Sequence, residues 1–303
     1  MMSPPPGVVA AWHTRGGAMS LDRPRIFGIL NVTPDSFSEK GRHFETEAAV
    51  EYGLQLVDEG ADIIDVGGES TRPGAEPVPT MDEIRRAEPV IAALAQRGVR
   101  VSVDTNKAVV AEAAIAAGAC IVNDVSGLRL DRTLAEVCAE SGVGVVLMHS
   151  RGNVRSMATY EHATYEGDPV DAVCAELLAA LHRATAAGIR EEAVVLDPGI
   201  GFAKRAEQSL RTLGAIPRLL ELRRPILVGA SRKRFIGELT GEATPAERVH
   251  GTTGANVAAL MLGARLFRVH DVRAARQALD VAWAILSAAL PQATALQHST
   301  TAS

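Results

Sequence analysis

Residues 26–38 read Ile-Phe-Gly-Ile-Leu-Asn-Val-Thr-Pro-Asp-Ser-Phe-Ser, an apolar run that stops abruptly at Asn31. Nothing in the run alternates between apolar and polar residues, which is typical of a strand buried on both faces. The Thr33-Pro34-Asp35 segment predicts a turned or extended backbone that ends the strand. Asn31 is therefore expected at the carboxyl end of a buried strand, where α/β proteins build their sites.

The same arrangement recurs along the chain. Short apolar segments bounded by glycine, proline or polar residues predict eight strands, over 26–31, 62–67, 99–103, 120–123, 143–148, 193–197, 225–229 and 265–269. Apolar residues at helical spacing predict helices between them, over 46–60 (with Thr46 as the N-cap), 81–96, 107–117, 131–141, 169–187, 206–222, 245–262 and 272–289.

Strand–helix units that follow one another without a linker predict a single-domain α/β fold, a closed (β/α)8 TIM barrel. The alternative is a doubly wound open sheet, but the glycine fingerprint usual after its first strand is missing. The chain has 303 residues, of which 47% are hydrophobic and only 4% aromatic, as expected for a large aliphatic core. We expect the barrel over residues 23–290, with flexible tails over 1–22 and 291–303.

Charge and cysteine content exclude several classes of protein. The formal net charge of −5 provides no field to hold nucleic acid. No segment approaches the ~20 apolar residues of a membrane span. The three cysteines, Cys120, Cys138 and Cys174, have no metal-like spacing and are expected as buried free thiols. Free thiols favour a reducing, cytoplasmic location.

Polar residues lie at the carboxyl end of every predicted strand. They are Asn31, Asp65, Asp104 to Asn106, Asn123 and Asp124, His149 to Arg151, Asp197, Ser231 to Arg234, and Arg268 to Asp271. In a barrel these positions meet at one face, the face that carries active sites. A solvated loop explains any single case. It does not explain polar groups at the strand boundary itself, which would point into the barrel mouth and need partners.

The residue types sort into two chemical groups. In-plane hydrogen bonds to a flat nitrogen heterocycle could come from Asp104, Asn123 and Asp197. Cations and donors for an anionic ligand could come from Arg72, Lys233, Arg268 and His270. The alternative for Arg72 and Lys233 is pairing with Glu69 or a neighbouring acid. Together the two groups predict an aromatic substrate that carries phosphate.

Seven motifs, in order over about residues 25–290, together resemble the dihydropteroate synthase family. They are Asn31-Val-Thr-Pro-Asp-Ser-Phe-Ser, Gly68-Glu-Ser-Thr-Arg-Pro-Gly, Ser102-Val-Asp-Thr, Asn123-Asp-Val-Ser-Gly, Asp197-Pro-Gly-Ile-Gly-Phe, Ser231-Arg-Lys-Arg-Phe-Ile-Gly and Arg268-Val-His-Asp-Val. The resemblance implies a (β/α)8 barrel and a folate-pathway transferase. Such enzymes join 6-hydroxymethyl-7,8-dihydropterin diphosphate to 4-aminobenzoate, giving dihydropteroate and diphosphate, and are sulfonamide targets.

The resemblance also implies roles for single residues. The pterin would be held by Asp104, Asn123, Met148, Asp197 and Lys233. The cofactor Mg²⁺ would be contacted by Asn31, and the diphosphate by Asn31, Arg268 and His270. The aminobenzoate would be surrounded by Phe37, Thr71, Arg72, Pro73, Phe202 and Ser231. The catalytic set would be Asp104, Asp197, Lys233, Arg268 and His270. The family also implies a homodimer, formed through the later helices.

The sequence departs from the family pattern in three loops, in one of which Ser150 follows His149 where a larger residue is often seen. Ser38 is followed by Glu39-Lys40-Gly41, where the family continues Ser-Asp-Gly-Gly, and Ala203 stands where glycine is common. These changes stiffen the loops and concern loop closure and sulfonamide response.

Two other functions remain open. A catalytically silent pterin-binding paralogue is disfavoured by Thr71-Arg72-Pro73. A methyltetrahydrofolate-dependent corrinoid methyltransferase of the related barrels is disfavoured by Lys233 and by Arg268 with His270.

Overall fold

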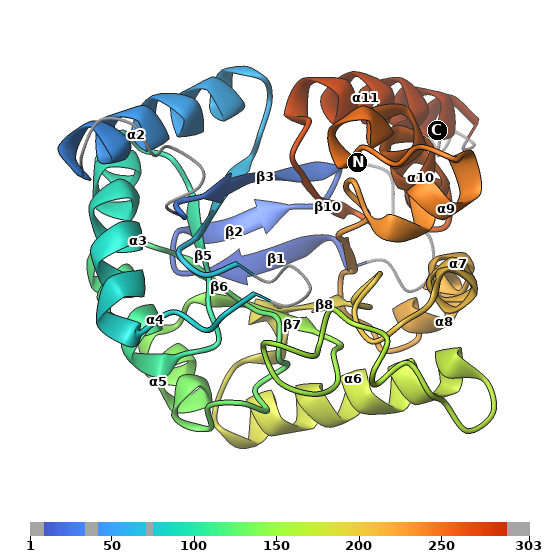
Figure 1. Ribbon diagram of the computed structural model, residues 1–303, viewed down its shortest axis with the longest axis horizontal. Coiled ribbons are helices and arrows are strands. Elements are labelled where there is room, and N and C mark those ends of the chain that lie inside the picture. Colours follow the sequence, from blue (N-terminus) through green and yellow to red (C-terminus); the bar gives the residue numbers. More distant parts are fainter. Residues whose placement is uncertain (1–8, 34–41, 71–74, 290–303) are drawn as a thin grey trace, which may run out of the picture.

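The structure, a computed structural model, describes residues 9–33, 42–70 and 75–289. Its centre is a parallel sheet with the strand order β8-β7-β6-β5-β4-β3-β10-β9. The strands are β3 (Arg25–Asn31), β4 (Ile63–Gly67), β5 (Val101–Asp104), β6 (Ile121–Asp124), β7 (Gly144–Met148), β8 (Val194–Asp197), β9 (Leu227–Val228) and β10 (Leu266–Val269). A parallel bridge between Leu196 and Ile226 closes the ring, which confirms the predicted (β/α)8 barrel (Figure 1).

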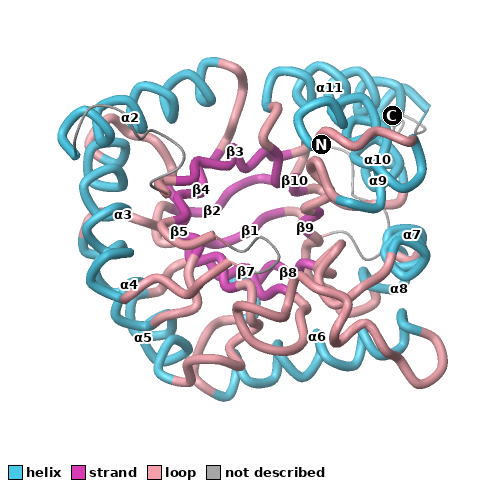
Figure 2. The backbone as a smooth tube through the Cα atoms, viewed as in Figure 1, coloured by secondary structure: helices cyan, strands magenta, loops and turns pink. Residues whose placement is uncertain are grey.

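The helices surround this ring (Figure 2). They are α2 (Arg42–Asp58), α3 (Thr80–Ala95), α4 (Ala108–Ala116), α5 (Thr133–Ser141), α6 (Pro169–Ala186), α7 (Ala206–Gly214), α8 (Ile216–Leu220), α9 (Arg234–Thr240), α10 (Val249–Met261) and α11 (Val272–Ala289), with 3-10 turns over Glu191–Ala193 and Pro245–Arg248. Each long helix buries an apolar stripe against the strands; in α3 this stripe includes Ile84, Ile91 and Leu94.

Several predicted boundaries are wrong. Helix α2 begins at Arg42, so Thr46 is not its N-cap. The helix predicted over 206–222 is two helices, because Pro217, in the first turn of α8, lacks the amide N–H that would continue α7. Helix α9 was not predicted, since seven residues are too few to show a periodic pattern.

The N-terminal segment is ordered where a flexible tail was predicted. Strands β1 (Ala11–Thr14) and β2 (Gly17–Ser20) form an antiparallel hairpin across the centre of the ring (Figure 1). Trp12 is fully buried, stacks on Phe27 with ring centroids 6.1 Å apart, and donates its indole N–H to Ala193 O at 2.8 Å. The expected tail over 1–22 is therefore wrong for the hairpin, whose apolar residues find their partners only in the barrel. Residues 1–8 and the expected tail over 291–303 lie outside the described residues.

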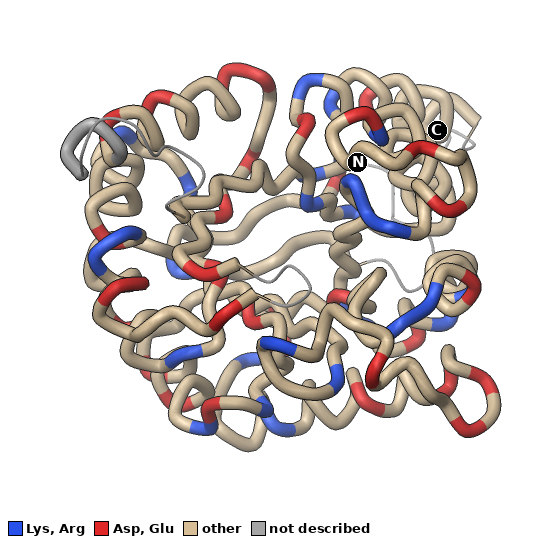
Figure 3. The backbone as a smooth tube through the Cα atoms, viewed as in Figure 1, with Lys and Arg blue, Asp and Glu red and all other residues tan. Residues whose placement is uncertain are grey.

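The surface and the thiols agree with the sequence. Acidic and basic residues are interspersed over the outer helices and loops (Figure 3). All three cysteines are free, with Cys120 and Cys138 buried and Cys174 partly buried. Among the helices of the described ranges, none is long and apolar enough to cross a membrane.

Candidate active site

The interior of the barrel changes from apolar to polar toward the carboxyl ends of the strands. The apolar layer consists of Phe27, Ile63, Ile121, Val146, Val195, Leu227 and Leu266. Because side chains alternate along a strand, the residue two positions later points the same way, one layer higher. Five such residues are Asp65, Asn123, Met148, Asp197 and Arg268, and Asp104 ends β5 beside them.

Arg268 is the hub of this polar layer. Its Nε donates to Asp65 Oδ2 at 2.6 Å, and its Nη2 donates to Asp104 Oδ2 at 2.6 Å. Asn123 Nδ2 donates to the same Asp65 oxygen at 3.1 Å. The other oxygen, Asp65 Oδ1, has no hydrogen-bond partner within the described part of the chain. Four strands thus meet in one charged cluster, and Asp65, which the sequence placed at this face without a role, is part of it.

Burial moves the pKa values of three titratable residues in the barrel mouth toward neutral pH. Burial raises the pKa of Asp104 to about 7, although Arg268 opposes the shift. Burial raises the pKa of Asp197 to about 6, against the amide of Gly199 and the charge of Lys233. Burial lowers the pKa of Lys233 to about 8, and Arg268 adds to that shift. Titratable groups perturbed together in a barrel mouth indicate a functional site.

The loops after β8 and β9 bring three predicted residues together. Asp197 Oδ1 accepts a hydrogen bond from Gly199 N at 2.7 Å. Lys233 Nζ lies 4.0 Å from the centre of the Phe202 ring, a cation–π contact that orders both side chains. The ammonium of Lys233 therefore joins the two loops at the edge of the polar layer.

His270 is held as a neutral imidazole and supplies no positive charge. Its backbone N–H donates to Ser231 Oγ at 3.1 Å, and its Nδ1 lies 3.0 Å from the same hydroxyl. Burial, followed by the charges of Arg232 and Arg268, lowers the pKa of His270 to about 3. Any contact of His270 with an anion would therefore begin as a hydrogen bond of the neutral ring.

The chain is similar to known proteins over most of its length. The family described as pterin binding enzyme matches residues 27–270. The dihydropteroate synthase of Mycobacterium leprae is 46% identical over 275 residues, covering 89% of this chain and 96% of the relative. That of Escherichia coli K12 is 41% identical over 279 residues, covering 90% and 96%. The chain belongs to the dihydropteroate synthase family.

Solved structures of the family have the same fold. The Xanthomonas albilineans dihydropteroate synthase with 4-aminobenzoic acid has a TM-score of 0.85 at 45% identity, covering 93% of this chain and 99% of that one. The same enzyme in complex with 7,8-dihydropteroate has a TM-score of 0.80 at 41% identity, covering 93% and 100%. The Yersinia pestis synthase in a sulfonamide drug complex has a TM-score of 0.84 at 38% identity, covering 91% and 99%.

Several residues that the family resemblance singled out cannot be placed. Phe37, Thr71, Arg72 and Pro73 lie outside the described residues, as do Glu39 and Lys40 of the divergent first loop. The described residues that flank the loop after β4 form hydrogen bonds with Lys107. Lys107 Nζ donates to Glu69 Oε1 at 2.8 Å, to Glu83 Oε2 at 2.6 Å and to Val78 O at 2.7 Å. Glu69 is therefore the partner of Lys107, a residue that sequence reasoning did not select.

Asn31 lies at the end of β3, and its neighbour on β4 is a glycine, which has no side chain. Asn31 pairs in register with Gly67. A Cβ built on Gly67 would lie 3.6 Å from Asn31 Oδ1 and 3.6 Å from Asp104 Cβ, so its absence leaves space between them. Within the described ranges, no group of three His, Cys, Asp or Glu residues could hold a metal ion.

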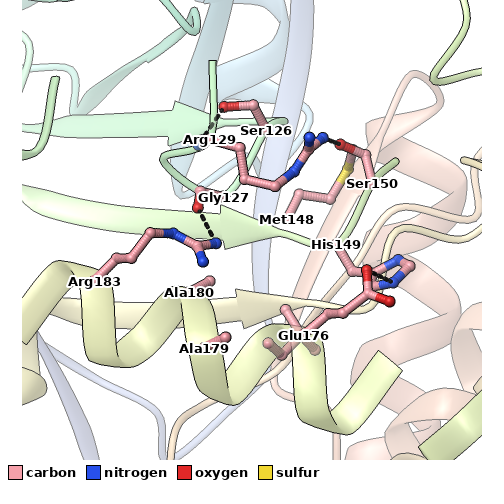
Figure 4. A pocket seen from close by; sticks show the side chains of 11 residues that line it. Ser126, Gly127, Arg129, Met148, His149, Ser150, Glu176, Ala179, Ala180 and Arg183 are labelled. Carbon is pink, nitrogen blue, oxygen red and sulfur yellow. Dashed lines mark hydrogen bonds and ion pairs between the residues drawn. The ribbon is translucent and has the colours of Figure 1, made fainter. Parts of the chain in front are cut away.

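A small cavity of 80 Å³ lies between the carboxyl ends of β6 and β7 and helix α6 (Figure 4). Met148 and His149 line it together with Glu176 of α6. Arg183 Nη2 donates to Gly127 O at 2.8 Å, and Arg129 Nη2 donates to Ser150 Oγ at 3.2 Å. The cavity therefore adjoins the site through Met148 and His149, and its two arginines are already committed to protein acceptors.

Proposed function

We propose that this chain condenses 6-hydroxymethyl-7,8-dihydropterin diphosphate with 4-aminobenzoate to give 7,8-dihydropteroate and diphosphate. The observation that carries the proposal is the buried cluster of Arg268 with Asp65 and Asp104 in the barrel mouth. It combines acceptors for a nitrogen heterocycle with a fixed guanidinium for a phosphate. The family membership and the solved relatives with 4-aminobenzoic acid and 7,8-dihydropteroate support the same reaction.

Recognition of the pterin would use complementary hydrogen bonds in a dry site. The aminopyrimidine edge of a pterin offers N–H donors, which Asp104 and Asp197 would accept, while Asn123 can both donate and accept. Lys233 would donate to ring acceptors, and Met148 would offer an apolar contact to the ring face. Because these side chains are buried, with Asp197 only 4% exposed, each bond would be stronger than in water.

The chemical step would follow from how charge develops. The bond between the pterin methylene carbon and the diphosphate oxygen breaks, and its electron pair leaves with the diphosphate. The positive charge that develops on the pterin would be stabilised by the carboxylates of Asp104 and Asp197. The departing diphosphate would be met by Arg268 and by a hydrogen bond from His270. The arylamine nitrogen then attacks the methylene and releases a proton; an arylamine is neutral at pH 7, so no strong base is required.

The aminobenzoate would lie beside the pterin at the loops after β8 and β9. Phe202 and Ser231 would form one part of its surroundings, with the ring of Phe202 ordered by Lys233. Phe37, Thr71, Arg72 and Pro73 would complete it. Sulfonamides would compete for the same place, and the Glu39-Lys40 departure bears on how well they do so.

Magnesium would neutralise charge on the diphosphate. Mg²⁺ usually keeps several waters and takes one or two protein oxygens together with substrate phosphates. The amide oxygen of Asn31, next to the open space at Gly67, fits that role. Asn31 would therefore hold a magnesium ion that arrives with the diphosphate.

Product analysis separates this proposal from the two alternatives. Purified protein with both substrates and Mg²⁺ is expected to form dihydropteroate. A silent paralogue would bind pterin and form no product. A corrinoid methyltransferase would instead demethylate methyltetrahydrofolate in the presence of a reduced corrinoid, a reaction we expect to be absent.

We also propose a cytoplasmic homodimer that pairs through α10 and α11. Met261, Val281 and Ile285 on these helices are large apolar residues that are 54%, 63% and 63% exposed. Val281 and Ile285 lie one helical turn apart and so share a face.

The three free thiols favour a reducing compartment. Light scattering should give a dimer for the wild type and a monomer for Val281→Glu/Ile285→Glu; a monomeric wild type would contradict the dimer.

A further inference from the structure

Lys204 is a buried lysine beside the site. The reaction proposed above assigns it no role. It follows β8, and it is 1% exposed. Its Nζ donates to Gly199 O at 3.1 Å and to Phe202 O at 3.2 Å, and lies 2.7 Å from His149 Nδ1. Lysine is almost never fully buried unless it is paired, because a buried charge requires compensation. All three N–H groups of this ammonium therefore have acceptors, and two of those acceptors belong to one turn.

The turn over residues 199–203 has a left-handed backbone that needs contacts to hold it in place. Gly199, Gly201 and Ala203 have φ of 65°, 78° and 47°, in the left-handed region. Alanine is strained there, because its Cβ approaches the backbone. A Cβ on Gly199 would lie 1.9 Å from His149 O, so the turn is pressed against the end of β7. Lys204 binds the carbonyls of this turn from the inside.

The same turn contacts one residue of the candidate site, Asp197, and carries another, Phe202. Gly199 N donates to Asp197 Oδ1 at 2.7 Å, which orients the carboxylate. Phe202 follows in the turn, and its ring faces Lys233 Nζ. A change in the turn would therefore move the expected pterin acceptor and the expected aminobenzoate wall together.

The far side of Lys204 is supported by a chain of polar groups. A protonated lysine can only donate, so His149 Nδ1 accepts and the proton of the ring is assigned to Nε2. His149 Nε2 lies 3.2 Å from Glu176 Oε2, which is within ion-pair distance although the two atoms lack hydrogen-bond geometry (Figure 4). Arg151 Nε in turn donates to Glu176 Oε1 at 3.0 Å. Burial, followed by the charge of Lys204, lowers the pKa of His149 to about 4, so the ring stays neutral and able to accept.

We infer that Lys204, supported by His149 and Glu176, is a positioning residue that fixes the 199–203 turn and thereby orients Asp197 and Phe202 for the reaction. The inference rests on the proposed function for the roles of those two residues. Lys204 contacts neither substrate in this account. It acts through the turn, and its positive charge acts on the carboxylate of Asp197.

The charge gives the role a signature that simple packing would lack. The cations that face Asp197 are Lys233, Arg268 and Lys204, and each lowers the pKa of that carboxyl. Burial lowers the pKa of Lys204 to about 7, while Asp197 and Glu176 oppose the shift and Arg151 and Lys233 add to it. Removal of the lysine charge should therefore move the acid side of pterin binding to higher pH.

The test compares Lys204→Met with Arg265→Met, which removes a buried cation at the opposite end of the barrel. Arg265 is 5% exposed and donates to Ala264 O at 2.8 Å. We expect Lys204→Met to weaken 6-hydroxymethylpterin binding at least tenfold by fluorescence titration. It should also raise the KM for aminobenzoate, lower kcat and shift the acid limb of pterin binding upward. Arg265→Met should leave all four within twofold, whatever it does to thermal stability.

A second pair of variants keeps the test decisive if Lys204→Met does not fold. His149→Asn retains an acceptor near the position of Nδ1, whereas His149→Leu removes it. We expect the leucine variant to reproduce the pterin-binding defect and the asparagine variant to keep most of the affinity. If His149→Leu and any folded Lys204→Met bind pterin and turn over like the wild type, the positioning role is wrong and the proposed function stands. If the wild type itself binds no pterin, the proposed function is what fails.

Discussion

Arg268 and Asp104, 164 residues apart in the sequence, are joined by a 2.6 Å hydrogen bond across the mouth of the barrel. Through its second bond, to Asp65, the same guanidinium allows two carboxylates to be buried side by side. Burial of two carboxylates requires a compensating cation, since an uncompensated buried charge is strongly unfavourable. The acceptors proposed to bind the pterin therefore depend on the residue proposed to bind the diphosphate.

Arg268→Met is expected to lower both stability and activity. It leaves Asp65 and Asp104 unpaired, and breaking a buried ion pair lowers the free energy of unfolding by about 3 kcal/mol. Urea denaturation measures that loss, and the synthase assay should give no measurable product. Arg211→Met, which removes an exposed pair with Asp168, is the matched control and should be far milder. Equal losses in the two variants would mean that the cluster does not support the fold.

Asp197→Asn is expected to reduce kcat/KM for the pterin substrate by about 100-fold or more. The substitution keeps the shape of the side chain but removes a charge-assisted hydrogen bond and the stabilisation of positive charge on the pterin. Steady-state kinetics with varied pterin diphosphate measures the effect. Asp171→Asn, at an exposed carboxylate, is the control. Near-normal kinetics in Asp197→Asn would remove the main support for the proposed pterin site.

The activity should fall as the pH is lowered through about 7 to about 6. The pKa values of Asp104 and Asp197 are raised to about 7 and about 6, so both carboxylates take up protons in this range and stop accepting hydrogen bonds. On the alkaline side, Lys204 and Lys233, with pKa values lowered to about 7 and about 8, lose their charges. A profile of kcat/KM for the pterin substrate should therefore be bell-shaped. A flat profile from about pH 5 to about pH 9 would contradict these assignments.

Lys107→Met tests whether the buried tie between Glu69, Glu83 and Val78 matters for the second loop. We expect the KM for aminobenzoate to rise several-fold, while the affinity for pterin alone stays unchanged. Stability should also fall, because Glu69 and Glu83 are left buried without a cation. The double variant Lys107→Met/Glu83→Gln should recover part of the stability and none of the KM. An unchanged KM would show that this tie serves the fold alone.

Trp12→Ala tests the unexpected N-terminal hairpin. Removal of a fully buried indole and its hydrogen bond to Ala193 should lower the free energy of unfolding by about 3 kcal/mol or more. His13→Ala, on the opposite face of the same strand, should have little effect. Kinetics of the folded Trp12→Ala protein should remain close to wild type, because the hairpin covers the end of the barrel away from the site. Equal stability of the two variants would argue against a structural role.

The barrel could be predicted because its information is local. Each strand is a short apolar run. A polar residue two positions after an inward-facing apolar residue can be seen in the sequence, as Asn123 after Ile121. The hairpin at 11–20 could not, since Trp12 has an apolar partner only once Phe27 is placed beside it. The break before α8 could have been predicted from Pro217.

The candidate site divides in the same way. Residues at strand ends, such as Asp104 and Asp197, are found by their position in the pattern. Asp65 becomes a site residue only through Arg268, which is 203 residues away. Lys107 and Lys204 look like surface lysines in the sequence, because the carboxylates that Lys107 binds and the histidine that Lys204 binds come from other segments. The neutral state of His270 depends on burial and on two arginines, and no local pattern encodes it.

The central claim is that this barrel mouth makes dihydropteroate. The most direct measurement is the formation of dihydropteroate by the purified chain with pterin diphosphate, 4-aminobenzoate and Mg²⁺, followed by mass spectrometry beside the Asp197→Asn variant. We predict product that requires both substrates, is suppressed by a sulfonamide, and is reduced about 100-fold in the variant. Pterin binding by the wild type without any product, or equal product from both proteins, would contradict the account.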